Sequence, residues 1–252
     1  MFMRVYTCGP SWVEMLTCIY EAWSSKLGHE NLKLLREPIN QLSIFDEYIH
    51  VDPDEDKAKK LMDAIYRKIS PYVYRELAFA SMAYEEDVLD NIFHVLILGF
   101  AYGPNVLEMM QYRDVARNYE IRKRVGNEAH HFREFLRFHQ LGNVFVAHLE
   151  PKSRVVEYLG PCFQDRMPSE NFIIVDDVHS EAVIHYANTP FYVQKLTEDE
   201  LTKLMQTEQV NDGFTDLWKV FFDSVSIRER ENEKCQNNLF PQWLRKHAVE
   251  FL

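Results

Sequence analysis

The sequence predicts an α+β fold with a mainly helical N-terminal half, an antiparallel sheet of about four to six strands in the second half, and C-terminal helices packed on that sheet. Two observations predict it. Apolar residues recur at helical spacing through the first half, and from about residue 134 they occur in short runs rich in β-branched and aromatic residues. Because neither repeats nor Gly/Ser/Pro-rich linkers interrupt the chain, we predict one domain over 1–252. Its parts are a helical lobe (about 10–133), a sheet lobe (about 134–196) and C-terminal helices (about 198–250).

The N-terminal half contains several helix starts. A helix over 11–25 follows Gly9-Pro10, and in the next helix, over 51–70, Asp52 can cap and Pro53 suits the first helical position. Ser70 and Pro71 open a further helical region that runs to about residue 102, and another helix is expected over 106–118. Three short β-like pieces, "RVYTC", "LKLL" and "EYIHV", lie between these segments.

The second half supplies the strands. The segments "NVFVAHL", "NFIIVDD", "EAVIHYA" and "FYVQKL" are short and bounded by turn-forming residues, which is typical of β-structure. A helix over 154–166 connects the first two, and a hairpin turn is expected at 188–190. Thr197 and Glu200 form a capping-box pattern that starts the C-terminal helices.

Composition limits the function classes. The formal net charge of −11 disfavours non-specific binding of nucleic acid or anionic membrane by the whole surface, and it favours an acidic cytoplasmic protein. The four cysteines form neither a CxxC pair nor a disulfide framework. We find no secretory leader, no membrane span and no phosphate- or dinucleotide-binding glycine motif, so no cofactor is predicted.

The stretch "VGNEAHHFREFLRF" (125–138) concentrates charged and histidine side chains. On a helix over about 114–133, one face is apolar, and Lys123, Gly126, His130 and Arg133 share the other. Seven Arg/Lys face four Asp/Glu between positions 113 and 139, so the region is locally basic and could contact phosphate. An ordinary solvated helix face explains the same charges.

Beyond Arg133 the apolar spacing changes. Phe135, Arg137 and His139 alternate with apolar residues, which predicts a strand that turns at "QLGN" into "VFVAHL". The spacing also fits a helix continued to Phe138. In the hairpin interpretation, Arg137 lies on the sheet beside the end of the basic helix.

The same residues also allow metal-binding and catalytic interpretations. Glu128, His130 and His131 scatter around a helix because adjacent side chains diverge by about 100°, so we predict no metal site there. Asp176, Asp177 and His179 could ligate a cation, but turn chemistry explains them equally well. If the chain is an enzyme, the acid–base candidates are His130 with Glu128 or Glu229.

A second polar segment, "SIRERENEKCQNNLFPQW", lies near the C-terminus. Arg228 and Arg230 alternate with glutamates, which is typical of a self-neutralising surface. The functional alternative is a helix terminus at which Arg228, Arg230 and Asn232 bind a phosphate or a partner's carboxylate.

These segments resemble a bacterial family called "probable DNA metabolism protein", whose activity is undetermined. The resemblance rests on "VGNEAHHFREFLRF" with "LGNVFVAHLEP" and on "LWKVFFDSVSIRERENEKCQ"; "YTCGPSWVEMLTCIYEAW" and 51–70 also look like the family's pattern. The family-like polar residues are Glu128, His130, Arg137, Glu229, Arg230 and Asn232. The chain departs from the family pattern at Glu134, where members often have Gly, and at 177–179, where Arg or Lys usually follows in the turn.

The resemblance implies a role in DNA repair by association. Family members are encoded beside a radical SAM protein assigned to DNA repair or modification, or are fused to a uracil-DNA glycosylase-like domain. We therefore expect an accessory protein that works with that radical SAM partner, and possibly DNA, through a local Arg/His surface. Two alternatives stay open: a DNA-directed enzyme with a His–Glu acid–base site, and a protein-interaction module that does not bind nucleic acid.

Overall fold

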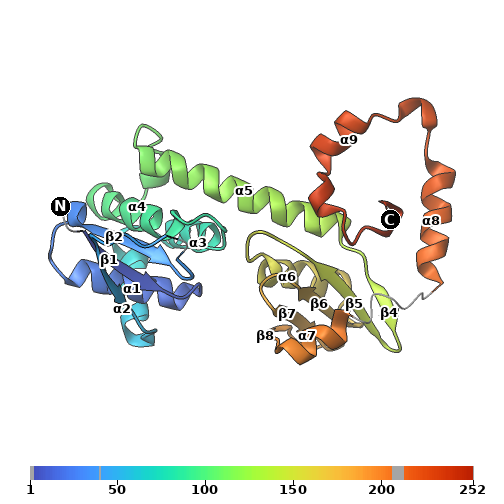
Figure 1. Cartoon of the computed structure of the whole chain (residues 1–252), viewed down its shortest axis with the longest axis horizontal. Coiled ribbons are helices and arrows are strands. Elements are labelled where there is room, and N and C mark those ends of the chain that lie inside the picture. The colour runs from blue at the N-terminus through green and yellow to red at the C-terminus, as the bar shows by residue number, and fades with distance from the viewer. Residues whose placement is uncertain (1–2, 40, 206–212, 252) are drawn as a thin grey trace. The chain divides into compact units, whose positions relative to one another are not determined.

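The computed structural model describes residues 3–39, 41–205 and 213–251, and the chain divides into two compact units, 1–125 and 126–252 (Figure 1). The sequence predicted one domain with three lobes, whereas the boundary between the two units falls within a single long helix. Each unit has its own sheet and its own buried core, so we describe them separately.

The first unit contains a three-stranded parallel sheet, in the order β2-β1-β3. Its strands are β1 (Arg4–Cys8), β2 (Leu32–Arg36) and β3 (Glu47–His50). The three β-like pieces of the sequence therefore pair with one another, which the prediction of a helical lobe did not include. Parallel strands need crossover connections, and the helix between β1 and β2 provides one of them.

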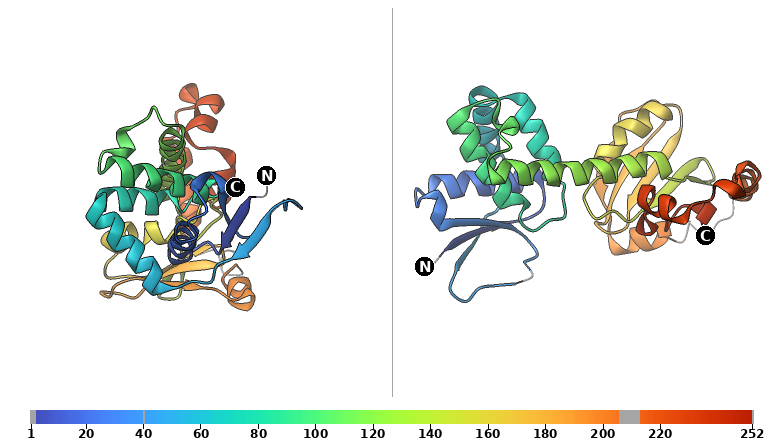
Figure 2. Two further views of the ribbon diagram at one scale, coloured as in Figure 1. Left: turned by 90° about the vertical axis from the view of Figure 1, so that its left-hand side faces the viewer. Right: turned by 90° about the horizontal axis from the view of Figure 1, so that it is seen from above.

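The helices of this unit gather on one side of its sheet (Figure 2). They are α1 (Trp12–Ser24), α2 (Glu55–Lys68), α3 (Pro71–Ala80) and α4 (Val88–Tyr102), with 3-10 turns at His29–Asn31 and Val106–Glu108. The start at Ser70-Pro71 is confirmed, since the Ser70 hydroxyl accepts the Val73 amide. The predicted cap Asp52 is wrong, because Asp54 caps α2 by accepting the Lys57 amide. The helix expected over 106–118 is instead a short 3-10 turn, and the next helix begins at Arg113.

The long helix α5 (Arg113–Phe135) begins in the first unit and ends in the second. Val115, Ile121, Val125, Ala129 and Phe132 are buried along it, at the helical spacing that the sequence predicted. The helix ends two residues beyond the predicted 133, so Phe135 is helical and the expected strand starts later, at His139.

The second unit contains a five-stranded sheet in the order β4-β5-β6-β7-β8. Its strands are β4 (His139–Leu141), β5 (Val144–Leu149), β6 (Asn171–Asp176), β7 (Glu181–His185) and β8 (Tyr192–Lys195). The predicted hairpins at "QLGN" and at 188–190 are confirmed. The sheet is mixed rather than purely antiparallel, because β5 and β6 are parallel and α6 (Val156–Arg166) connects them.

The C-terminal segment of the second unit is helical, as predicted. It comprises α7 (Glu198–Met205), α8 (Phe214–Val225), α9 (Glu233–Leu239) and 3-10 turns at Arg228–Arg230, Gln242–Leu244 and Val249–Phe251. The capping box at Thr197 and Glu200 is confirmed. Phe240 stacks on Phe135 with ring centroids 3.9 Å apart, which fastens this segment to the end of α5. No helix in the described part of the chain is long and apolar enough to cross a membrane.

Candidate functional site

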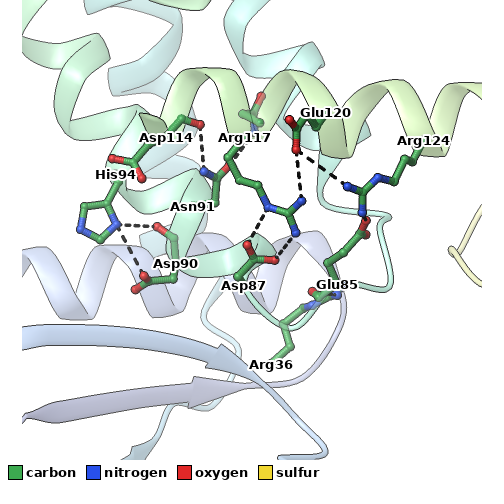
Figure 3. Close-up of polar contacts among 11 residues, drawn as sticks. Arg36, Glu85, Asp87, Asp90, Asn91, His94, Asp114, Arg117, Glu120 and Arg124 are labelled. Carbon is green, nitrogen blue, oxygen red and sulfur yellow. Dashed lines mark hydrogen bonds and ion pairs between the residues drawn. The ribbon is translucent and has the colours of Figure 1, made fainter. Parts of the chain in front are cut away.

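The cations of α5 in the first unit are largely neutralised by carboxylates. Arg117 binds Asp87 in a bidentate pair (Nε–Oδ2 2.8 Å, Nη2–Oδ1 2.9 Å), as Figure 3 shows. This guanidinium lowers the pKa of the Asp87 carboxyl. Arg124 binds the nearly buried Glu85 at 2.8 Å, and Arg122 binds Glu76 at 2.7 Å. These pairs hold α5 to the loop before α4 and to α3, so their arginines are committed to the fold.

The predicted basic stripe is therefore smaller than its sequence suggests. Lys123 is exposed, but it is flanked by the paired Arg122 and Arg124. In the second unit, His130 is exposed and its Nε2 lies 3.1 Å from Glu134 Oε1, one turn further along α5. Arg133 is half-buried, and its Nε is enclosed without a hydrogen-bond partner among the described residues.

Glu128 does not accompany His130 in an acid–base pair. Its side chain is buried and accepts the backbone N–H of Lys152 at 2.6 Å and of Ser153 at 3.2 Å. Burial raises the pKa of the Glu128 carboxyl, although these N–H groups act in the opposite direction. The residue anchors the loop after β5, and His130 has Glu134 as its carboxylate instead.

Arg137 is also occupied within the second unit. Its guanidinium forms a two-point ion pair with Glu250 near the C-terminus, and it lies over the Trp218 ring of α8, 5.1 Å from the centroid. The pair joins residues 113 positions apart in the sequence. Arg137 thus ties the C-terminal segment to the start of the sheet, rather than standing open to a phosphate.

The second polar segment lies on the surface. Glu229 and Arg230 are exposed in a 3-10 turn, and the Arg228 side chain lies outside the described residues. Asn232 caps α9, since its Oδ1 accepts the Cys235 amide at 2.9 Å. Among the described contacts, none joins this segment to Glu128 or His130, so the structure gives no support to a site shared by the two sequence motifs.

A histidine–carboxylate pair that sequence reasoning missed lies at the carboxyl ends of β5 and β6. His148 is buried, and its Nδ1 lies 3.1 Å from both carboxylate oxygens of Asp177. The neighbouring Asp176 instead holds the β6–β7 turn through the His179 side chain and two backbone amides, as turn chemistry predicted. Polar residues directly at the ends of two apolar strand runs, "NVFVAHL" and "NFIIVDD", were the signal in the sequence.

The His148 imidazole faces a small cavity. In the tautomer that donates from Nδ1 to Asp177, Nε2 is an acceptor. That Nε2 is buried without a hydrogen-bond partner among the described residues, as is Nδ1 of His131, which lines the same cavity. Arg137, His247 and the apolar side chains of Phe135, Phe240 and Leu244 complete much of the wall.

The size of this cavity decides what it can do. Its volume of about 10 Å³ matches one water molecule and excludes an organic substrate. Among the residues that the structure describes, no three His, Cys, Asp or Glu side chains converge as a metal site. The carboxylate-oriented imidazole has the geometry of an acid–base group, but the C-terminal segment covers it. In this conformation the cluster supports the packing of that segment.

The helix α8 has a different character from the rest of the unit. Trp218 and Phe222 contact Arg137 and Phe251, whereas Leu217, Val220, Phe221 and Val225 are between 53% and 67% exposed. These four side chains occupy one continuous arc of the helix, at positions i, i+3, i+4 and i+8. We call this arc the α8 face. Contiguous exposed apolar surface of this kind marks interaction sites.

One comparison with known proteins finds a match. The model of a domain of unknown function, DUF4130, matches residues 86–250, which include α4, α5 and nearly all of the second unit. The parallel sheet and α1–α3 lie outside this match. No curated protein matches the chain.

Proposed function

The chain belongs to the family of the DUF4130 domain, and we propose that it is an accessory protein of DNA repair or modification that binds a radical SAM partner through the α8 face. The repair context comes from the family resemblance described above. The mode of action comes from the geometry of the second unit. In this proposal the partner contacts the DNA, and the chain contacts the partner.

The exposed α8 face carries the proposal. An amphipathic helix that offers apolar anchors at i, i+3, i+4 and i+8 is suited to the hydrophobic groove of another protein. The helix is already held along one edge of this face by Trp218 and Phe222, so it is presented in a defined orientation. That orientation reduces the entropy lost on binding.

The charge distribution favours a protein partner over direct DNA binding. Four of the seven cations between 113 and 139 are in ion pairs with carboxylates: Arg117, Arg122, Arg124 and Arg137. A phosphate would have to displace these carboxylates, and the net charge of −11 repels it at longer range. The histidine cavity, with a volume of about 10 Å³, likewise has no room for a nucleotide.

The experiment measures association with a purified radical SAM protein of the kind that the family resemblance implies as the partner. Size-exclusion chromatography and calorimetry should show a complex with the wild-type chain. Leu217→Glu/Phe221→Glu places two carboxylates in the α8 face and should weaken binding by at least about tenfold. The matched control, Gln236→Glu/Asn238→Glu, adds the same charge to exposed positions of α9 and should bind as wild type.

A DNA titration separates the remaining hypotheses. Anisotropy of a labelled duplex, with the chain alone at about 50 and 200 mM salt, should show no salt-sensitive binding. Tight binding that falls steeply with salt would replace our proposal with a phosphate-binding surface. Failure of the wild-type chain to bind the radical SAM protein would overturn the proposal, as would unchanged binding by the α8 double variant.

A further inference from the structure

A second cavity lies in the first unit and is large enough for an organic molecule; apart from Phe100, its lining residues precede the DUF4130 match. It has a volume of about 340 Å³ and lies among α1, α2 and Phe100 of α4. Small-molecule sites begin at about 300 Å³, so the space suits a compact ligand. It is distinct from the water-sized histidine cavity and from the α8 face.

The wall of this cavity is aromatic and fixed. Trp23 and Phe100 line it, with ring centroids 5.2 Å apart and ring planes inclined by 75°. Two rings that do not line the cavity, His29 and Phe93, hold the indole at 5.0 and 5.8 Å. Leu61 adds an apolar surface from α2. Such a wall is suited to a flat aromatic group, because rings in contact gain more than the buried area alone provides.

The rim of the cavity is cationic. Lys60 and Lys68 lie two helical turns apart on α2, on either side of Ala64, and both line the cavity. Neither ammonium has a carboxylate partner among the described residues, and no carboxylate lines this cavity. Lys57 of the same helix differs, because it pairs with Glu21 and Asp54. The hydroxyls of Tyr20 and Ser24 add two further polar groups at the same cavity.

We propose that this cavity binds a small molecule with a flat aromatic ring and one anionic group, the ring against Trp23 and Phe100 and the anion between Lys60 and Lys68. Two unpaired lysines in a chain of net charge −11 provide charge complementarity for an anion only. The aromatic wall and the volume provide the selectivity for the ring.

The test uses a matched pair of fluorescent probes. 1-Anilinonaphthalene-8-sulfonate carries the anion, and N-phenyl-1-naphthylamine is its uncharged parent. Lys60→Gln/Lys68→Gln should weaken binding of the sulfonate by about tenfold and leave the uncharged probe within about twofold. Lys59→Gln/Lys123→Gln, which changes two exposed lysines outside the cavity, should bind both probes as wild type.

A second variant is designed to fill the cavity. Ala64→Phe places a ring in the space between the two lysines and should abolish binding of both probes, while thermal unfolding confirms that the chain is folded. Equal sulfonate affinity in wild type, the lysine double variant and Ala64→Phe would overturn the site. Displacement of the probe by decanoate but not by naphthalene-1-sulfonate would overturn the assignment to an aromatic ligand.

Discussion

The two units each contain a histidine–carboxylate pair at the carboxyl ends of two parallel strands, and the pairs differ in burial. In the first unit, His50 ends β3 and its Nδ1 lies 2.8 Å from Glu37, just after β2. In the second unit, His148 lies near the end of β5 and bonds Asp177, just after β6. The exposed fractions of the side chains are 51% and 40% in the first pair, and 0% and 6% in the second.

The difference shows that burial, rather than the local bond, decides what such a pair does. Glu37 also accepts the Thr7 hydroxyl at 2.7 Å, and its pKa is lowered by that bond and by His50. In turn, Glu37 raises the pKa of His50. These are the properties of a solvated ion pair that water can replace. His148 and Asp177 are buried from the solvent that could replace a lost partner, so their bond contributes directly to stability.

The largest effect is expected from breaking the buried pair. Asp177→Leu leaves the His148 Nδ1 without an acceptor, and the free energy of unfolding should fall by about 1–3 kcal/mol. Urea unfolding followed by circular dichroism measures it. Asp177→Asn keeps one oxygen acceptor, so its free energy of unfolding should fall by less. A wild-type urea midpoint for Asp177→Leu would show that the pair contributes nothing to stability.

Glu128 provides the next test of buried carboxylates. Glu128→Ala removes the acceptor for the Lys152 and Ser153 amides and should lower the free energy of unfolding by about 1–2 kcal/mol. Glu128→Gln keeps an oxygen acceptor and avoids burying a charge, so at neutral pH it should be as stable as the wild type. An equal fall in the free energy of unfolding of both variants would mean that the charge of Glu128 itself is required.

The fold was predictable where the signal is local. The strands of the second unit were visible as β-branched runs, and the caps at Ser70 and Thr197 follow from neighbouring residues. The parallel sheet of the first unit was not predicted, because the 4–8 strand pairs with 32–36 and 47–50 across intervening segments. Short apolar runs alone do not specify such non-local partners.

The candidate site was less predictable for the same reason. The sequence placed Lys123, His130 and Arg133 on α5 but could not show that the partner of Arg137 is Glu250, far along the chain. It also could not show that Glu128 is turned inward to a loop. Burial of His148 and exposure of the α8 face depend on how the C-terminal segment packs, which helical periodicity does not determine.

The contributions of His131 and His50 to the free energy of unfolding should depend on pH in opposite directions. Burial and the neighbouring His130 lower the pKa of His131, so its contribution to stability is lost as pH falls through about 6.5 toward the folded-state pKa. The raised pKa of His50 gives the reverse: its contribution is present below about 6.5 and is lost as pH rises through the folded-state pKa. Unfolding of His131→Gln and His50→Gln across this range should show opposite slopes relative to wild type; slopes of the same sign would contradict the assignment.

The smallest effect is expected from the exposed pair, and it tests whether that pair is held by charge. Glu37→Gln keeps the shape of the side chain and an oxygen for Thr7 but removes the charge that faces His50. The pKa of His50 should then fall toward its ordinary value, as measured by NMR titration of the imidazole C–H signals. Thr7→Val serves as the control: it removes the hydroxyl that is the largest cause of the lowered Glu37 pKa, so the pKa of Glu37 should rise while His50 keeps its charged neighbour. An unchanged His50 pKa in Glu37→Gln would mean that Asp52, whose Oδ1 lies 3.5 Å from His50 Nε2, is the main cause of the shift.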